Sequence, residues 1–521
     1  MEGSLIQNML FYRKRISETR EAIYDYDTGK RYTYGELYRR ANRLARFLVE
    51  ECHLQKGDCI AFFSANHPSF FESFFATFYT GIIVSVYNYR LREQELLSLI
   101  RKEQPKILFY ENDFIDKIKV FRKETDIKYY ITLSDASQNG DMTYEHLLDR
   151  PDREPLESPV SQEDIQLYLH TGGTTGTPKT AKLSYRCIFY NCVCDVMTNA
   201  LTMEDCEYVF LPLFHTSAWN IITLPLLMCG GRIILTRHFH TETALKIIAE
   251  ERPTLGMAVP FIYKALAEHP DFEKTDVSCF RWLSSGGATT QKNVMEPWWN
   301  RGVPIANGYG MTEVGPHNMV VPMVGTSVDL LREKWNSIGI PMYFNQVRIV
   351  DEFGQDVEDG IVGELLFKGP LIFSGYLKDP EETASAVQNG WVYTGDMAWR
   401  DRDGYYYIAG RKKHMFISGG ENIYSTEIET VLGAYPAVKD VCVIGVKDPR
   451  WGEVGKAILV VDPDRYSEEE LRAFAANNLS TIKVPKYYEV TDHIPVNSAG
   501  KRDMVKIHQM FGDLFDAENQ A

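Results

Sequence analysis

The sequence predicts an α/β protein in which a small C-terminal domain follows a much larger N-terminal part. Near the N-terminus, apolar runs typical of buried strands alternate with helical segments, as in a mostly parallel sheet covered by helices. From residue 415 onward the pattern changes to short strands and short helices. A chain of 521 residues is long enough for two or more domains, so this change indicates a domain boundary.

The composition is typical of a globular protein. Hydrophobic residues make up 44% and charged residues 24% of the chain, and the net charge of −15 disfavours a nucleic-acid partner. No basic segment followed by an apolar run opens the chain, and no uncharged apolar run reaches the roughly 20 residues of a membrane-spanning helix. Nine cysteines, an odd number, indicate free core thiols. We therefore expect a cytoplasmic protein without a transmembrane segment, and a homodimer is left open.

The first elements are expected in the order helix, strand, helix, strand. Residues 33–48 carry apolar side chains at helical spacing and predict an amphipathic helix. Residues 59–63 and 82–86 indicate buried strands, and the aromatic-rich segment 70–79 between them favours a core helix over a membrane-touching face. Residues 138–164, rich in Asp, Glu, Pro and Ser, predict a surface connection to the next strand.

A loop of glycine and threonine follows the strand predicted at residues 165–169. It comprises Thr171, Gly172, Gly173, Thr174, Thr175, Gly176, Thr177, Pro178 and Lys179. Its backbone N–H groups, hydroxyls and one ammonium can surround a polyanion, so we interpret it as a phosphate cradle. The spacing differs from that of the NTPase P-loop, and residues 181–184 resume a strand instead of a helix. A flexible surface loop is the alternative interpretation.

Three later strands are expected to end in turns, where ligands bind in open α/β sheets. The first strand and its turn lie within residues 209–220, which include His215 and Trp219. A lone His or Trp is more often a packed core residue than a ligand contact. Residues 281–288 and 305–313 form the other two, which end in small residues. Turns of small residues allow the flat base of a nucleotide to approach the backbone closely.

Two polar features follow these turns. Gly308-x-Gly310 is not a dinucleotide fingerprint, because Glu313 stands where the third glycine belongs, and a carboxylate suits Mg²⁺ better than pyrophosphate. Residues 363–396 then predict short strands of a small β-rich subdomain. In residues 401–413, the side chain of an Asp can accept two hydrogen bonds from a ribose diol, and Arg411 can reach a hydroxyl group or a phosphate oxygen.

Five motifs, taken in order, resemble those of the adenylate-forming acyl-CoA synthetase superfamily. They are Thr-Gly-Gly-Thr-Thr-Gly-Thr-Pro-Lys (171–179), Gly-Tyr-Gly-Met-Thr-Glu (308–313), Tyr-Thr-Gly-Asp (393–396), Gly-Arg-Lys-Lys (410–413) and Asn-Ser-Ala-Gly-Lys (497–501). The resemblance covers nearly the whole chain. It implies an N-terminal adenylation domain, 1–412, with two α/β-sheet subdomains and a small β-barrel, and a mobile α+β lid domain, 413–521, that rotates at Lys413. It also implies that ATP activates a carboxylic acid to an acyl-adenylate with release of pyrophosphate, after which CoA captures the acyl group.

The resemblance assigns roles to individual residues. The implied catalytic residues are Lys501, Glu313, Thr171 and His215, with Glu313 also holding Mg²⁺ and Lys501 bridging the substrate carboxylate and the α-phosphate. The implied ATP-binding residues are Thr171, Gly172, Gly173, Thr174, Thr175, Gly176, Thr177, Lys179, Gly286, Gly287, Ala288, Asn307, Gly308, Tyr309, Gly310, Met311, Thr312, Asp396, Ile408, Arg411 and Lys501. The implied substrate contacts are His215, Trp219 and Gly310, and the implied CoA contacts are Ser418, Gly419, Gly420 and Glu421.

Some positions depart from the family pattern. Gly173 replaces a common serine, Thr180 a common glycine and His414 a common acidic residue. No aspartate follows Phe214, which argues against an α-amino acid as substrate. No long insertion follows Glu313, which favours CoA over a carrier-protein thiol as acceptor.

The nature of the acid is the least determined prediction. Residues 215–219 offer no fixed charge to a second polar group, so a medium- or long-chain fatty acid is favoured, with a role in fatty acid metabolism. An aryl acid lying against Trp219 is the alternative, as is an acyl-AMP ligase that loads a carrier protein. A non-enzymatic adenylate-binding protein is disfavoured, because Glu313, Asp396, Arg411 and Lys501 are all retained.

Overall fold

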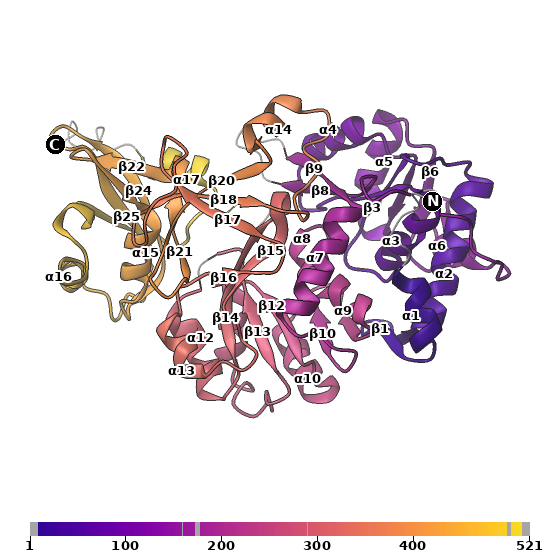
Figure 1. Cartoon of the computed structure of the whole chain (residues 1–521), viewed down its shortest axis with the longest axis horizontal. Coiled ribbons are helices and arrows are strands. Elements are labelled where there is room, and N and C mark those ends of the chain that lie inside the picture. The colour runs from indigo at the N-terminus through magenta and orange to yellow at the C-terminus, as the bar shows by residue number, and fades with distance from the viewer. Residues whose placement is uncertain (1–8, 159, 172–177, 289, 497–501, 513–521) are drawn as a thin grey trace.

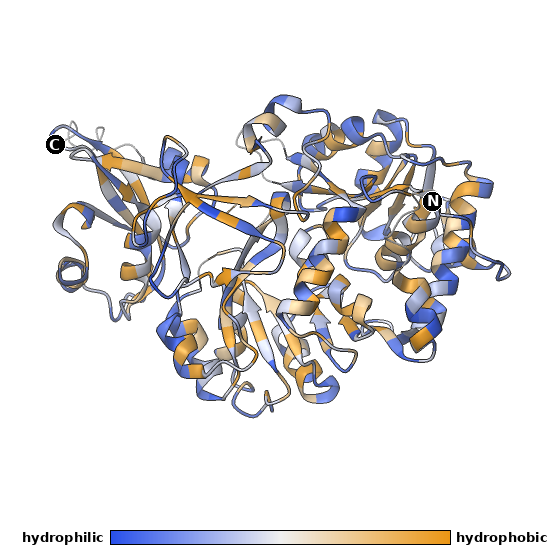
Figure 2. Cartoon of the chain, in the orientation of Figure 1, coloured by the Kyte–Doolittle hydropathy of each residue, from blue (hydrophilic) through white to orange (hydrophobic). Residues whose placement is uncertain are grey.

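The computed structural model describes residues 9–158, 160–171, 178–288, 290–496 and 502–512. Within these ranges, two large helix-covered sheets form the N-terminal part, and two smaller sheets lie toward the C-terminal end (Figure 1). Hydrophobic residues concentrate on the strands and on the inner sides of the helices, and hydrophilic residues on the outer loops (Figure 2). In the described ranges no helix is long and apolar enough to cross a membrane.

The first large sheet is parallel except at one edge. Its seven strands, in spatial order, are β7 (Met142–Thr143), β6 (Tyr129–Thr132), β5 (Ile107–Tyr110), β3 (Cys59–Phe63), β4 (Ile83–Val86), β8 (Ile165–Thr171) and β9 (Lys179–Ser184). Only β8 and β9 pair antiparallel, with Thr171 opposite Lys179. This hairpin carries the phosphate cradle predicted from the sequence.

The second large sheet has a parallel centre with antiparallel edges. Its nine strands are β16 (Ile340–Pro341), β15 (Gly315–Val320), β14 (Ile305–Met311), β13 (Trp282–Ser285), β12 (Leu255–Ala258), β10 (Cys206–Val209), β11 (Arg232–Leu235), β1 (Glu21–Asp25) and β2 (Lys30–Thr33). The predicted ligand-binding turns follow β10, β13 and β14. The sheet therefore brings these turns to one edge.

Helices cover the two large sheets, and the last helix of the N-terminal part packs against a smaller sheet. They are α1 (Met9–Ser17), α2 (Tyr34–Arg46), α3 (Ser69–Thr80), α4 (Glu93–Glu103), α5 (Ile115–Glu124), α6 (Tyr144–Leu148), α7 (Tyr185–Thr198), α8 (Thr216–Asn220), α9 (Thr223–Cys229), α10 (Thr241–Glu251), α11 (Pro260–Ala267), α12 (Lys292–Asn300), α13 (Val328–Glu333) and α14 (Pro380–Ala386). The predicted helix at 33–48 is α2, which begins at a capping box in which Thr33 and Glu36 bond each other's backbone N–H groups. It ends at Arg46, and residues Phe47–Glu51 form a π-helical turn.

One core joins the two large sheets. Every residue of α3 is buried, which confirms the predicted core helix. Its phenylalanines belong to a single apolar cluster that extends to Trp219 and to strands of the second sheet. The prediction of a surface connection at 138–164 was partly wrong, because α6 lies there and its Tyr144 hydroxyl donates to the buried Glu72 at 2.7 Å.

The third sheet is small and antiparallel, and lies where a small barrel was expected. It contains β17 (Gln346–Val350), β18 (Gly363–Lys368), β20 (Trp391–Arg400), β19 (Val387–Gln388) and β21 (Tyr406–Arg411). Its core includes Leu365 and Phe367, which share a cluster with Val314 and Met319 near the edge of the second sheet. The third sheet is thereby fixed beside β14 and β15.

The fourth sheet forms the C-terminal part of the molecule. It contains β23 (Glu421–Tyr424), β22 (Met415–Ser418), β25 (Gly452–Val461), β24 (Val438–Asp448) and β26 (Tyr487–Val490), with helices α15 (Ser425–Gly433), α16 (Glu468–Asn478) and α17 (Met504–Phe511). The chain passes from the third sheet to the fourth through a 3₁₀ turn at Lys412–His414. This α+β unit has apolar clusters of its own.

Candidate functional site

The described part of the predicted phosphate cradle is the end of the β8–β9 hairpin. Thr171 and Lys179 are register partners, and the cradle residues Gly172, Gly173, Thr174, Thr175, Gly176 and Thr177 lie outside the described residues. The Lys179 ammonium lies 2.5 Å from the Glu382 carboxylate of α14 and 5.3 Å from the centre of the Tyr376 ring. The structure thus places a cation at the foot of the cradle.

A buried carboxylate joins both strands of this hairpin. Glu103, at the end of α4, accepts a hydrogen bond from the Thr180 hydroxyl and lies next to His170 Nε2, both at 2.7 Å, and it accepts another from Ser85 at 2.6 Å. Burial favours a raised pKa for Glu103, but His170 and the two hydroxyls hold that pKa below its ordinary value. His170 and Thr180 directly flank Thr171 and Lys179. Sequence reasoning missed Glu103, because nothing in its local sequence marks a contact so distant along the chain.

Glu313 lies on the 3₁₀ turn Thr312–Val314 that follows β14. Its carboxylate is buried and accepts a hydrogen bond from the Tyr376 hydroxyl at 2.7 Å. Tyr376 therefore lies near both Glu313 and Lys179, and burial followed by the charge of Glu313 raises its phenol pKa. Among the described residues, no group of three or more His, Cys, Asp and Glu side chains could hold a metal ion without other ligands. A cation at Glu313 would need further ligands besides this carboxylate.

Tyr309, Asp396 and Arg411 meet from three different strands. The Tyr309 hydroxyl donates to Asp396 Oδ2, and Arg411 Nε pairs with Asp396 Oδ1, both at 2.7 Å. The Tyr309 ring stacks on Phe367 at 5.9 Å between centroids, which fixes its plane. Ile408 lies half-buried on β21 against the same apolar cluster. The structure therefore brings together Tyr309, Asp396 and Arg411, three of the residues that the sequence predicts for adenine and ribose.

The other residues predicted to bind ATP differ in their surroundings. Gly287 has φ +82°, a conformation that side chains rarely adopt, and it is exposed together with Ala288. Gly310, in contrast, is required by its own hairpin, because a Cβ there would lie 2.0 Å from the Pro316 carbonyl oxygen. Asn307 is buried, and its side chain bonds Thr290 N at 3.1 Å and the carbonyl oxygen of Trp335 at 2.8 Å.

The turn after β10 places the predicted substrate contacts at α8. Trp219 is 0% exposed, and its ring packs against Phe70, Phe71 and Phe74 of α3. Its indole N–H donates to the carbonyl oxygen of Leu213. His215 lies half-buried before the helix. Trp219 thus lies in the core, and a substrate would contact it only after the ring had moved.

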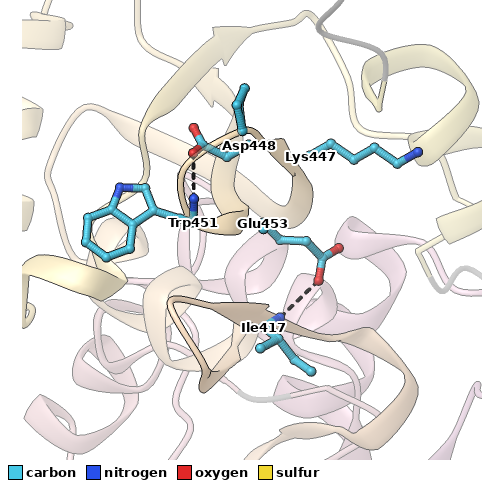
Figure 3. A pocket seen from close by; sticks show the side chains of 7 residues that line it. Ile417, Lys447, Asp448, Trp451 and Glu453 are labelled. Atoms are coloured by element: carbon cyan, nitrogen blue, oxygen red, sulfur yellow. Dashed lines mark hydrogen bonds between the residues drawn. The ribbon is translucent and has the colours of Figure 1, made fainter.

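The predicted CoA loop borders a cavity in the C-terminal part. Ser418 is buried, whereas Gly419, Gly420 and Glu421 are exposed in the turn between β22 and β23. A cavity of about 720 Å³ lies beside it, between Ile417 on one side and Lys447, Asp448, Trp451 and Glu453 on the other (Figure 3). Glu453 accepts a hydrogen bond from Ile417 N at 3.0 Å, and Asp448 accepts one from Trp451 N at 2.9 Å. A Cβ on Gly419 would lie 2.9 Å from the Trp451 ring, so the loop and the cavity wall are in direct contact.

The predicted hinge lies at the boundary between the third and fourth sheets. Lys413 is exposed within the 3₁₀ turn, and burial, followed by the charge of Lys413, lowers the pKa of His414 to about 4, so this imidazole is neutral at pH 7. Lys501 lies outside the described residues. The next residue, Arg502, forms an isolated β-bridge with Val496 and an ion pair with Asp440 on β24. Both ends of the Lys501 loop are therefore attached to the fourth sheet.

The comparisons with known proteins agree over nearly the whole chain. Residues 13–377 match a family described as AMP-binding enzyme, and residues 427–501 match its C-terminal domain. A feruloyl-CoA synthase from Amycolatopsis sp is 36% identical over 93% of this chain and 95% of its own. An indoleacetate–CoA ligase from Aromatoleum aromaticum is 33% identical over 90% and 91%, and the long-chain-fatty-acid–CoA ligase FadD13 of Mycobacterium tuberculosis is 30% identical over 95% and 96%. The ATP-bound structure of MatB from Rhodopseudomonas palustris superposes with a TM-score of 0.86 at 27% identity, covering 98% of this chain and 99% of that one.

Proposed function

Because the chain belongs to the AMP-binding enzyme family and is an AMP-forming acid–CoA ligase that uses ATP and CoA, we propose that its acid is an aryl carboxylic acid. Support comes from the similar feruloyl-CoA and indoleacetate ligases, whose names specify aryl acids. Trp219 is buried and would have to move before either class of acid could contact its ring, so its position does not decide between them. The earlier expectation of a medium- or long-chain acid remains the second candidate, supported by the likeness to FadD13.

The reaction has two steps with balanced bond changes. In the first, a carboxylate oxygen forms a bond to the α-phosphorus of ATP while the bond from that phosphorus to the pyrophosphate oxygen breaks. In the second, the CoA thiol loses its proton, its sulfur bonds to the acyl carbon, and AMP leaves with the former carboxylate oxygen. Both steps bring anions together, so preorganised cations and N–H donors lower the barrier.

We assign the first step to residues around Tyr309. The observation that carries this assignment is the meeting of Tyr309, Asp396 and Arg411, a group suited to adenine and ribose. Lys179 and the hydroxyl groups of the adjoining loop would hold the β- and γ-phosphates.

Glu313 fits a magnesium ion that is shared with the nucleotide. Mg²⁺ is commonly held by one or two carboxylates together with substrate phosphates, and Glu313 offers one buried carboxylate near Lys179 and Tyr376. The ion would supply positive charge next to the phosphate oxygens. The carboxylate of Glu313 would hold the ion in position, and the hydrogen bond that the Tyr376 hydroxyl donates would keep this carboxylate in place.

The second step is assigned to the C-terminal unit. We propose that residues 1–412 form the adenylation domain and that residues 413–521 form a lid domain that rotates at Lys413. The turn Ser418–Glu421 and the adjoining cavity would then meet the pantetheine arm and other parts of CoA. Lys501 would act in the first step, carried by the loop that Arg502 and Val496 attach to the fourth sheet.

The test is a pyrophosphate-release assay with a panel of aryl and aliphatic acids, with and without CoA. We expect pyrophosphate release to depend on the acid, thioester to form only with CoA, and aryl acids to give the highest kcat/KM. The variant Lys501→Ala is expected to lower adenylation by about 10²–10³, because it removes a preorganised cation, while a supplied acyl-adenylate is still converted to thioester. Faster turnover of a long-chain acid than of any aryl acid would overturn the substrate proposal, and normal adenylation by Lys501→Ala would overturn the assignment of that lysine.

A further inference from the structure

Residues 373–377 connect the third sheet to α14 and run along β9, the edge strand of the first sheet. Two backbone hydrogen bonds, at 2.8 and 3.0 Å, join this segment to Lys182 of β9, and a third, at 2.9 Å, joins it to Thr180. At its N-terminal end the segment donates a backbone hydrogen bond to the carbonyl oxygen of Glu313 at 3.0 Å. Segment 373–377 therefore links the cradle hairpin to the turn that carries Glu313.

One side chain of this segment contacts both charged groups of the proposed phosphate site. The Tyr376 hydroxyl donates to Glu313 Oε1 at 2.7 Å, and the Lys179 ammonium lies 5.3 Å from the centre of the Tyr376 ring. Tyr376 is 7% exposed, and the ring of Phe373 packs edge-on against it at 4.9 Å between centroids. A single buried side chain thus joins the carboxylate that fits Mg²⁺ to the cation at the foot of the cradle.

Contacts other than these two charges fix the place of Tyr376. Its backbone N–H donates to the hydroxyl oxygen of Thr383 on α14 at 2.9 Å, and its backbone forms an isolated antiparallel bridge with Ala181 of β9. Helix α14 lies beside the hairpin and carries Glu382, the carboxylate paired with Lys179 (Figure 1). Tyr376 is therefore anchored on two sides before a nucleotide binds.

Both charged groups need such support. A lysine ammonium is a compact charge on a flexible four-carbon stem, so its position has to be set by what it packs against. A buried carboxylate that loses a hydrogen-bond donor bears the cost of its desolvation. Groups that act on one polyphosphate have to stand at a fixed separation before it binds, because ordering them on binding costs part of the binding free energy.

We propose that Tyr376 is a positioning residue for the nucleotide: its hydroxyl holds Glu313, its ring holds Lys179, and together they set the separation at which these two groups meet the phosphates of ATP. This inference rests on the proposed function and specifies how the phosphate site is assembled. Different parts of one side chain make the two contacts, so substitutions can remove them one at a time. Because the hydroxyl acts through Glu313, its loss should affect nucleotide binding only when Mg²⁺ is present.

The experiment measures by calorimetry how the full chain binds α,β-methylene-ATP, whose α–β linkage cannot be cleaved, with and without Mg²⁺. Tyr376→Phe removes the hydroxyl and keeps the ring. It should weaken binding in Mg²⁺ by about tenfold or more, as expected for a lost hydrogen bond to a charged group, with little change when Mg²⁺ is absent. Tyr376→Leu also removes the ring and should weaken binding in both conditions. In steady-state assays Tyr376→Phe should raise the KM for ATP and leave the KM for the acid unchanged.

Tyr144→Phe is the matched control. The Tyr144 hydroxyl also donates to a buried carboxylate, that of Glu72, at 2.7 Å, but this pair joins α6 to α3 and lies outside the proposed site. The control should lower thermal stability without weakening nucleotide binding. Glu313→Gln supplies a second check, because adding Tyr376→Phe to it should cause little further loss of Mg²⁺-dependent binding if the hydroxyl acts through Glu313.

The possible failures are distinguishable. The inference is overturned, while the proposed function stands, if Tyr376→Phe binds the analogue in Mg²⁺ as the wild type does, if it weakens binding equally without Mg²⁺, or if it raises the KM for ATP and for the acid alike. Tyr376→Phe keeps the ring that packs against Phe373, so it decides the result even where Tyr376→Leu is unstable. If no acid supports pyrophosphate release by the wild-type protein, the proposed function fails, and the calorimetry still tests Tyr376 by itself.

Discussion

At the scale of single residues, the molecule contains a buried carboxyl group, that of Glu207. Glu207 lies on β10 near the centre of the nine-stranded sheet, where its carboxyl group accepts one hydrogen bond, from the Thr223 hydroxyl at 2.7 Å. Burial raises its pKa from the ordinary 4.5 to about 8, although the hydroxyl opposes this shift. At pH 7 this side chain is mostly protonated, so it serves the fold as a neutral group.

The variant Glu207→Gln tests that conclusion through the pH dependence of stability. A folded pKa raised above 4.5 means that the stability contribution is fully present below pH 4.5 and is lost as pH rises through about 8. The wild-type free energy of unfolding should therefore fall with rising pH relative to that of the variant, by at most roughly 5 kcal/mol in total. Urea unfolding between pH 5 and 9 measures the difference, and parallel curves for the two proteins would contradict the assignment.

At the scale of elements, the β8–β9 hairpin is held near its loop end by a helix from another part of the chain. Glu103 of α4 contacts His170 on one strand and Thr180 on the other, each directly next to a residue assigned to phosphate binding. Thr180 is one of the departures from the family pattern, and its hydroxyl takes part in this anchor. Threonine makes the chain stiffer at this position than glycine would. Its hydrogen bond to Glu103 holds the strand directly next to Lys179.

We expect Glu103→Gln to weaken ATP use more than the fold. Thr180 and Ser85 donate to different oxygens of Glu103, so the single oxygen of a glutamine can accept from only one of these two hydroxyls in its present position. The variant also loses the negative charge opposite His170, and a hydrogen bond to a charged group contributes about 1.5–3 kcal/mol. Adenylation kcat/KM for ATP should fall by about tenfold or more, whereas thioester formation from a supplied acyl-adenylate should be unchanged.

Ser85→Ala is the matched control for Glu103→Gln. It removes one hydrogen bond to Glu103 without changing a side chain on either strand of the hairpin, although Ser85 lies opposite Tyr168 of β8 in the sheet, and it should have the smaller effect on ATP use. An equal loss in both variants, or an equal loss in both half-reactions, would show that the cluster has a general structural role only.

The elements also show what sequence could and could not predict. The core helix at 70–79 and the strands at 59–63 and 82–86 were predictable, because their apolar periodicity is local and burial follows from it. The motif residues Tyr309, Asp396 and Arg411 were predictable as a group only through the resemblance to a known family. Glu103 and Tyr376 were missed, because their partners lie 67 and 63 residues away and no local pattern encodes such contacts.

At the scale of the whole molecule, the passage from the third sheet to the fourth is very short. Strand β21 ends at Arg411 and β22 begins at Met415, so the 3₁₀ turn at Lys412–His414 is the direct link between the two sheets. Lys412 is tied to the third sheet by an ion pair with Glu364 at 2.7 Å. Rotation of the C-terminal unit about this link would therefore be concentrated at residue 413, in agreement with the proposed hinge.

We expect Lys413→Pro to separate the two half-reactions. Proline fixes φ near −65° and so restricts rotation at this position, which should preserve acyl-adenylate formation and abolish transfer to CoA. Lys413→Ala is the matched control, because it removes the side chain but leaves φ free, and it should retain both activities. Single-turnover measurements of adenylate and thioester report the two steps, and equal loss of both in the proline variant would contradict the hinge.

The ammonium of Lys179, at one end of the predicted phosphate cradle, is already paired with a carboxylate of the same chain, that of Glu382. Any anion that binds Lys179 has to compete with a carboxylate from α14 that is already 2.5 Å away. With Lys179 in its proposed role, such an internal competitor would weaken binding of the incoming nucleotide and would speed the departure of pyrophosphate, because Glu382 could pair with the lysine again as the product leaves. Replacing Glu382 with glutamine should then make the enzyme more strongly inhibited by its own pyrophosphate.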